Sequence, residues 1–134
     1  MLGESLGTVT GKVTGRRVRP STVMPTLEMT FEAAGEFGGV ATTWMGTFWA
    51  QVRPDGSLYG ECPQQGAIIT ADGVGPWTSA GVGWFTETGG TAFRGSAYLT
   101  IAPPKLAHLT RSAILYEFDI AADASAVGKF WAWT

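Results

Sequence analysis

The sequence has little of what would form a metal site, a redox site or a disulfide framework. Its 134 residues include one cysteine, Cys62, and one histidine, His108. A single cysteine cannot form an internal disulfide, and a lone histidine without a cysteine cluster lacks the partners that a transition metal needs. We therefore expect no metal and no cofactor. With no histidine partner in view, Cys62 is expected to serve as a small apolar side chain and not as a nucleophile.

Charge excess and long apolar runs are also missing. Only 15% of the residues are charged and the formal net charge is −2, which gives no overall field to attract nucleic acid or anionic lipid. The stretch Met1–Gly7 has neither the basic start nor the apolar run of a signal peptide, and no apolar stretch reaches membrane-spanning length. We expect a cytoplasmic protein that binds neither nucleic acid nor membrane.

Common catalytic and phosphate-binding motifs are absent as well. The chain has no Gly-x-Ser-x-Gly, no phosphate loop and no dinucleotide fingerprint. Four basic residues, Lys12, Arg16, Arg17 and Arg19, lie close together near the start of the chain. They could contact the phosphates of a single strand, as some β-barrels do, but the acidic overall balance argues against this. No motif therefore names a reaction.

What the sequence does contain is typical of an all-β domain. Nineteen glycines, seven prolines and six tryptophans indicate many turns and a large aromatic interior, and 134 residues suffice for one domain, 1–134, without staples. Leu27, Met29 and Phe31 alternate with polar residues, which is the period of a strand with one apolar face. The glutamates on the other face, Glu28 and Glu32, are more typical of a solvated face than of a paired-carboxylate site.

The central hairpin spans residues 42–70, where two runs rich in aromatic residues and threonine flank the turn Arg53–Gly56. Similar patterns extend along the whole chain and predict eight strands, at 6–19, 27–33, 40–52, 57–69, 77–86, 91–101, 108–120 and 127–133. Pro63 cannot donate to a ladder, so we expect a bulge at Cys62–Pro63.

Strands joined by such short connections are antiparallel neighbours, so the chain is a meander. It would form a closed barrel, in which the last strand pairs with the first, or a two-sheet sandwich. Closure removes the exposed edges, and glycines within the strands suit a strongly coiled sheet, where a backbone bends or a ring lies across it. We favour the eight-stranded antiparallel up-and-down barrel. Its lumen would be filled by side chains or hold one small ligand.

Several runs resemble a group of small bacterial proteins akin to the allene oxide cyclase-like superfamily, which includes dirigent-like proteins: Met45–Trp49, Arg53–Glu61, Gly81–Gly83, Arg94–Ser96 and Phe130–Trp133. The resemblance covers most of the chain in pattern. It implies an allene oxide cyclase-like or lipocalin-like barrel with an apolar cavity. In the cyclases that cavity folds a reactive substrate so that it closes a ring.

Three residues are candidates for catalysis. Tyr59 and Glu61 share one face of a strand beside an aromatic-rich strand, where rings would desolvate the carboxylate and suit it to acid or base work. The alternative is an ordinary solvated face. Hydrophobicity alone would turn Arg94 outwards, but in a partly polar lumen it would be the counter-ion of Glu61 or Glu28, or the anchor of an acidic ligand.

Six aromatic residues are the candidates for ligand binding: Phe31, Trp44, Trp49, Trp84, Tyr98 and Tyr116. Three functions remain open. They are a barrel that binds a small hydrophobic molecule, a cofactor-independent cyclase or isomerase that uses the same cavity, and an interaction module with a filled barrel. The volume and lining of the lumen would discriminate between them. Apolar residues on both faces of the strands at 91–101 and 108–120 further suggest a homo-oligomer.

Overall fold

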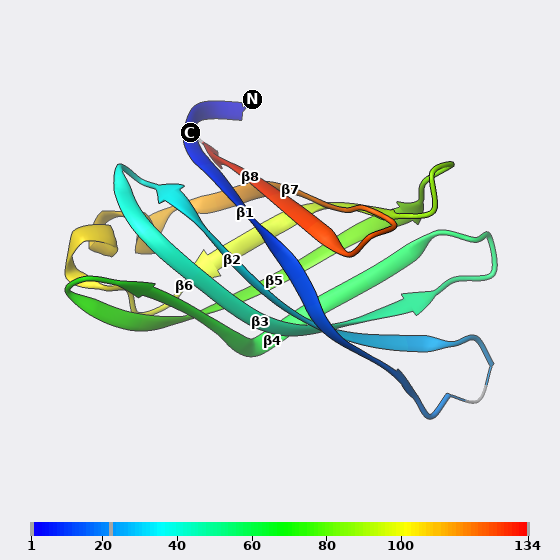
Figure 1. Cartoon of the computed structure of the whole chain (residues 1–134). Helices are drawn as coiled ribbons and strands as arrows, with labels where there is room; N and C mark the ends of the chain where they lie inside the picture. The colour runs from blue at the N-terminus through cyan, green and yellow to red at the C-terminus, as the bar shows by residue number, and fades with distance from the viewer. Residues whose placement is uncertain (1, 22, 134) are drawn as a thin grey trace.

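All eight predicted strands form, and they close into one barrel (Figure 1). The computed structural model describes residues 2–21 and 23–133, so that Met1, Thr22 and Thr134 lie outside the described residues. The elements are β1 (Leu2–Arg19), β2 (Thr26–Phe37), β3 (Val40–Val52), β4 (Leu58–Thr70), β5 (Gly73–Phe85), β6 (Thr91–Leu99), the 3₁₀ helix η1 (Pro104–Arg111), β7 (Ala113–Ile120) and β8 (Ser125–Trp133). The prediction of an eight-stranded antiparallel barrel is confirmed.

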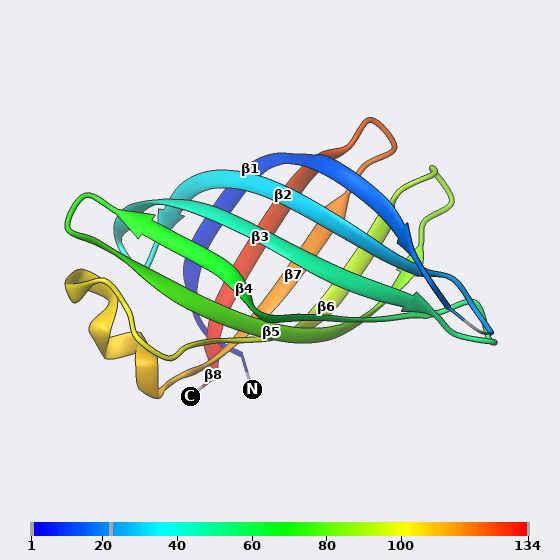
Figure 2. The same ribbon diagram turned by 90° about the horizontal axis from the view of Figure 1, so that it is seen from below.

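Closure joins the two ends of the chain. β1 and β8 pair antiparallel from Leu2 opposite Trp133 to Lys12 opposite Ser125, and both termini lie at the same end of the barrel (Figures 1 and 2). Beyond Lys12, β1 leaves β8 but stays paired with β2 as far as Arg19 opposite Thr26. These outer halves of β1 and β2 project as a hairpin from the opposite end of the barrel.

The turns follow the expected chemistry. Gly38 and Gly39 connect β2 to β3 with φ of 61° and 79°, in the left-handed region that glycine tolerates. The predicted bulge in β4 is confirmed: its register with β5 shifts between Cys62 and Gly66, and Gln64 has φ 55°.

One boundary prediction is wrong. His108 does not belong to a strand, because residues Pro104–Arg111 form η1 and β7 begins only at Ala113. Pro104 presets a helical φ for the first turn, and Leu106 and Leu109, three residues apart, lie on one side of a 3₁₀ helix. Both leucines are buried, so that η1 covers one end of the barrel. No helix in the described part of the chain is long and apolar enough to cross a membrane.

Alternation along the strands divides the barrel into an inner and an outer face. On β2, Met29, Phe31 and Ala33 are buried. Glu32, between Phe31 and Ala33, and Ala34, which follows Ala33, are exposed. On β3 the buried residues are Thr42, Trp44, Gly46, Phe48 and Ala50. The apolar period of two therefore sets which residues form the core.

Glycines make room for large rings inside the barrel. A Cβ atom on Gly66 would lie 2.1 Å from the Trp77 ring, and one on Gly46 would lie 2.7 Å from the same ring. Gly46 and Gly66 are paired across β3 and β4, so the indole lies flat along a row of glycines. The expectation that rings cross glycines in a coiled sheet is confirmed at this place.

The two ends of the barrel differ. At one end, Leu106 and Leu109 of η1 pack at the Gly38 turn, and the backbone N–H of Lys105 donates to the Asp72 carboxylate at 3.2 Å. The other end carries the β1–β2, β3–β4, β5–β6 and β7–β8 connections, and no helix lies there among the residues that the structure describes (Figure 1). Access to the interior is thus to be sought at the end opposite η1.

Candidate functional site

The interior contains a small apolar cavity between the two ends of the barrel. Its volume is about 60 Å³. Aromatic side chains form most of its wall: Phe31, Trp44, Phe48, Trp77, Phe93, Tyr116, Phe118 and Phe130. Val9 and Ala97 add further carbon, and β4 contributes Gly60, Glu61 and Cys62. The lumen is neither completely filled nor wide open.

The rings pack against one another around this cavity. Trp44 and Phe130 are stacked with centroids 4.9 Å apart and planes 12° from parallel. Phe31 lies 4.9 Å from Phe118 and 6.0 Å from Trp77. Contacts of this kind hold the rings in fixed positions, so that the cavity keeps its shape.

Neutral polar groups also belong to the wall, and two of them have a raised pKa. Burial raises the pKa of Tyr116 to about 12, and the neighbouring Ser79 hydroxyl lowers it by a smaller amount. Burial likewise raises the pKa of Cys62 to about 11, and its thiol donates to the Thr47 carbonyl at 3.3 Å. Both groups therefore keep their protons near neutral pH, and Tyr116 can act as a hydrogen-bond donor but not as a base.

Trp77 supplies a second donor. Its side chain is 5% exposed, and its Nε1–H is buried without a hydrogen-bond partner among the residues that the structure describes. By contrast, the Trp44 Nε1–H donates to the Thr42 hydroxyl at 3.0 Å. An unpaired buried donor costs about 1–3 kcal/mol, so Trp77 would gain stability from any ligand oxygen that reached its Nε1–H.

The structure places three of the six aromatic candidates inside the barrel. Phe31, Trp44 and Tyr116 line the cavity. Trp49, Trp84 and Tyr98 lie on the outer face, because each sits one residue out of step with the buried positions of its strand. The expectation that these last three residues line the lumen is therefore wrong. That any of the six residues binds a ligand stays a prediction.

Tyr59 and Glu61 lie together on the outer face of β4. Leu58, Gly60 and Cys62 are the buried positions of this strand. The Tyr59 hydroxyl donates to Glu61 Oε1 at 3.3 Å, and the Trp49 ring packs against Tyr59 with centroids 5.9 Å apart. Glu61 also borders the cavity, next to the bulge in β4. Tyr59 and Glu61 therefore share one face of the strand, as predicted, but this is the outer face, and their side chains meet outside the lumen.

Arg94 also lies on the outer face, where it is held by acidic neighbours of β7. Its guanidinium is 2.7 Å from Asp119 and 3.7 Å from Glu117, and it stacks 5.2 Å from the centre of the Trp84 ring. It is therefore not the counter-ion of Glu61 or Glu28. Arg94 points outwards, as the hydrophobicity of β6 alone predicted.

The remaining candidates also lie outside the cavity. Glu28 pairs with Arg17 at 3.1 Å and Arg19 at 3.8 Å on the outer face. His108 is exposed on η1. Among residues 2–21 and 23–133 no three acidic, cysteine or histidine side chains are grouped so that they could hold a metal.

Sequence reasoning did not identify Ser79 as a cavity residue, and it did not single out Trp77 from the six tryptophans. The signal that could have found them is the spacing of glycines on β5, where Gly75, Gly81 and Gly83 alternate in step with both residues. Glycines at alternate positions mark the face across which neighbouring rings lie, so the residues in step with them face inwards.

Two solved structures have the same fold. A protein of unknown function from Clostridium acetobutylicum is 15% identical, with 100% of both chains covered and a TM-score of 0.82. A conserved protein of unknown function from Rhodopseudomonas palustris is 14% identical, with 98% of this chain and 97% of that chain covered and a TM-score of 0.80. No protein-family model and no curated protein matches the chain. At these identities the likeness shows a shared eight-stranded barrel and nothing about activity.

Proposed function

We propose that the protein binds a small, mostly apolar molecule with one hydrogen-bond acceptor in the lumen of the barrel. The observation that carries the proposal is the Trp77 Nε1–H, a buried donor without a described partner on a residue that lines this mostly apolar cavity. A ligand oxygen at this donor would recover the free energy that an unpaired N–H costs. The carbon wall would bind the rest of the molecule by the hydrophobic effect.

The Tyr116 hydroxyl favours the same class of ligand. It lines the same cavity and stays protonated, so it too can donate to an acceptor. Cys62 stays a neutral thiol and binds no anion. A carbonyl or ether oxygen therefore fits the cavity better than a carboxylate does, because no cation faces the lumen to balance a negative charge among the described lining residues.

The size of the cavity limits the ligand. A dry cavity of about 150 Å³ in another protein holds benzene, whereas the volume here is about 60 Å³. We therefore propose a ligand with only a few heavy atoms, such as a short ketone. A larger ligand would have to push rings away from the glycine row under Trp77.

Acetone and isobutene test this proposal, because they have nearly the same shape and differ in the acceptor oxygen. In the ¹H–¹⁵N spectrum the Trp77 indole signal is identified by its loss in Trp77→Phe. Acetone should shift this signal and the Tyr116 ring signals, whereas isobutene should shift only the ring signals. Trp84→Phe, on the outer face, should leave both responses unchanged. If neither compound shifts the Tyr116 ring signals at millimolar concentration, the lumen is not a binding site.

The second candidate is the cofactor-independent cyclase or isomerase that the allene oxide cyclase-like resemblance implies. The observation that favours it is the protonated Tyr116 hydroxyl inside an aromatic wall. The wall would select the reactive shape of a substrate, and Tyr116 would donate to an oxygen on which negative charge develops. Turnover of a small apolar epoxide that is lost in Tyr116→Phe, while the acetone response remains, would support this candidate. Glu61→Gln and Arg94→Ala would then test the two outer residues.

A further inference from the structure

The open end of the barrel contains a second pocket, with a volume of about 150 Å³. Its apolar surface comes from Leu27, Met29, Phe85 and Ile120, and two arginines of β1, Arg16 and Arg17, lie at its rim. The β5–β6 and β7–β8 turns contribute Gly89, Gly90 and Ala121. This pocket belongs to the mouth opposite η1 and shares no lining residue with the lumen cavity.

A bulge in β1 turns Arg16 towards this pocket. Val13 is opposite the buried Phe31, but the register then shifts, so that Gly15 is opposite Thr30 and Arg16 is opposite Met29. Residues directly opposite each other in an antiparallel pair point to the same face. Since Met29 is 5% exposed and faces inwards, Arg16 lies on the inner face of the mouth.

Without the bulge, Arg16 would lie in the outward register of β1. Val9 and Val13 are the buried residues of this strand, and an unbroken alternation would place Arg16 with the exposed Thr10 and Lys12. Bulges often re-aim a side chain beside a functional site. The guanidinium is thus placed above an apolar floor by a specific irregularity of the backbone.

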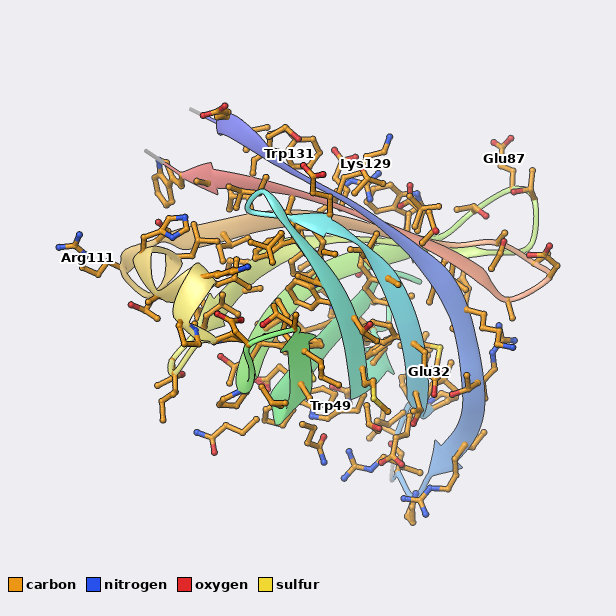
Figure 3. The ribbon with its side chains drawn as sticks, turned by 60° about the vertical axis from the view of Figure 1, so that its left-hand side comes forward. Glu32, Trp49, Glu87, Arg111, Lys129 and Trp131 are labelled. Atoms are coloured by element: carbon orange, nitrogen blue, oxygen red, sulfur yellow. The ribbon has the colours of Figure 1, made fainter. Side chains whose placement is uncertain are left out.

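The charge at the mouth is not balanced within the described residues. Arg16 forms no ion pair with any residue of 2–21 and 23–133, whereas Arg17 and Arg19 share the single carboxylate of Glu28. On the neighbouring turn the Asp123 carboxylate accepts from the Ser125 backbone N–H at 3.0 Å and from its hydroxyl at 2.7 Å. Glu87 is exposed on the β5–β6 turn (Figure 3). β1 therefore carries three guanidiniums at this end of the barrel, and Glu28 pairs with two of them.

We propose that this mouth binds an amphipathic organic anion, with its oxyanion on Arg16 and its apolar part on Leu27, Met29, Phe85 and Ile120. An inorganic anion would leave the apolar floor unused, and a neutral apolar molecule would leave Arg16 unpaired. A single-stranded nucleic acid fits less well, because Phe85 is the one aromatic ring among the described lining residues and a single ring makes a poor stacking platform. This site is separate from the lumen proposal and does not depend on it.

Two dyes with the same ring system test the proposal. Anilinonaphthalene sulfonate carries a sulfonate, whereas phenylnaphthylamine lacks it. The wild type should bind the sulfonate dye more tightly, and added salt should weaken that preference. Arg16→Gln should weaken binding of the sulfonate dye about tenfold or more, since hydrogen bonds to charged groups are the strong class, and should leave the neutral dye unchanged.

Matched variants complete the experiment. Arg111→Gln removes the same charge from an exposed site on η1, at the other end of the barrel, and should change neither dye (Figure 3). Arg16→Lys should retain part of the preference, and Phe85→Ala should weaken both dyes. Trp77→Phe should leave both dyes unchanged, which separates this site from the lumen. Equal affinity of wild type and Arg16→Gln for the sulfonate dye, or displacement of that dye by an oligothymidylate, would overturn the proposal.

Discussion

The inner and outer faces of the barrel both carry large aromatic rings, but the rings have different neighbours. Inside, Trp77 is opposite Gly66 and Leu99 on the adjacent strands. Outside, Trp49 is opposite Glu28 and Glu61. In these two cases an inner ring has small or apolar neighbours across the ladder, and an outer ring has carboxylates.

Replacing one tryptophan from each face gives the largest expected contrast. Trp44→Ala removes a ring that is 2% exposed and stacked on Phe130, and it should lower the free energy of unfolding by about 3–5 kcal/mol. Trp84→Ala removes a ring that is 45% exposed, and it should cost less than about 1 kcal/mol. Urea denaturation of the two variants measures the difference. Similar losses from both variants would mean that the outer face is covered in solution, as in the predicted homo-oligomer.

A methyl group added under an inner ring should have the next largest effect. Gly66→Ala would place its Cβ 2.1 Å from the Trp77 ring and should destabilise the fold by about 1–3 kcal/mol in the same measurement. Gly15→Ala is the matched control, because a Cβ there meets nothing within 4 Å. If the clash is the cause, Gly66→Ala should cost less in the background of Trp77→Phe, since the smaller ring leaves room. An equal cost in both backgrounds would assign the effect to backbone strain.

The fold could be predicted from the sequence because its signals are local. The alternation of Leu27, Met29 and Phe31 and the Arg53–Gly56 turn depend only on the period of a strand and on turn chemistry. Because the connections are short, the meander is the topology that remains. Closure of the barrel then follows from the cost of exposed strand edges. η1 was missed because two leucines three residues apart are too short a signal to separate a 3₁₀ helix from a strand.

The site was harder to predict because it depends on which side chains of each strand point into the barrel. β6 has Phe93 and Leu99 on one face and Tyr98 on the other, so hydrophobicity only weakly separates its inside from its outside. Arg16 changes face at a bulge that neither a proline nor a glycine pair announces beforehand. A shift of one residue reverses every side chain that follows, and such a shift is set by tertiary contacts.

The inner face should also respond to alkaline pH through Cys62. Its pKa is raised to about 11 in the fold by burial, from an ordinary value of 9.0. Between these values the unfolded chain has lost the proton and the native state has kept it, so stability falls as pH rises above about 9. The loss should approach about 1 kcal/mol per pH unit, and Cys62→Ala should remove it. Denaturation at pH 9 and pH 10 checks this, and the comparison of wild type with Cys62→Ala separates the thiol from Tyr116, whose raised pKa adds a similar effect from about pH 10. An unchanged pH slope in Cys62→Ala would mean that the thiol is accessible to water in the native state.

The smallest expected effect is that of the ion pairs on the outer face. Arg94→Ala breaks the contacts of Arg94 with Asp119 and Glu117, but the guanidinium and both carboxylates are at least 35% exposed. Exposed pairs contribute below about 1 kcal/mol, and salt screens them. The variant should therefore lose a few tenths of a kcal/mol at low salt and nothing at high salt, and acetone should still shift the Trp77 indole signal. Loss of the acetone response in a folded Arg94→Ala protein would show that this outer cluster acts on the lumen, which its place on the outer face does not predict.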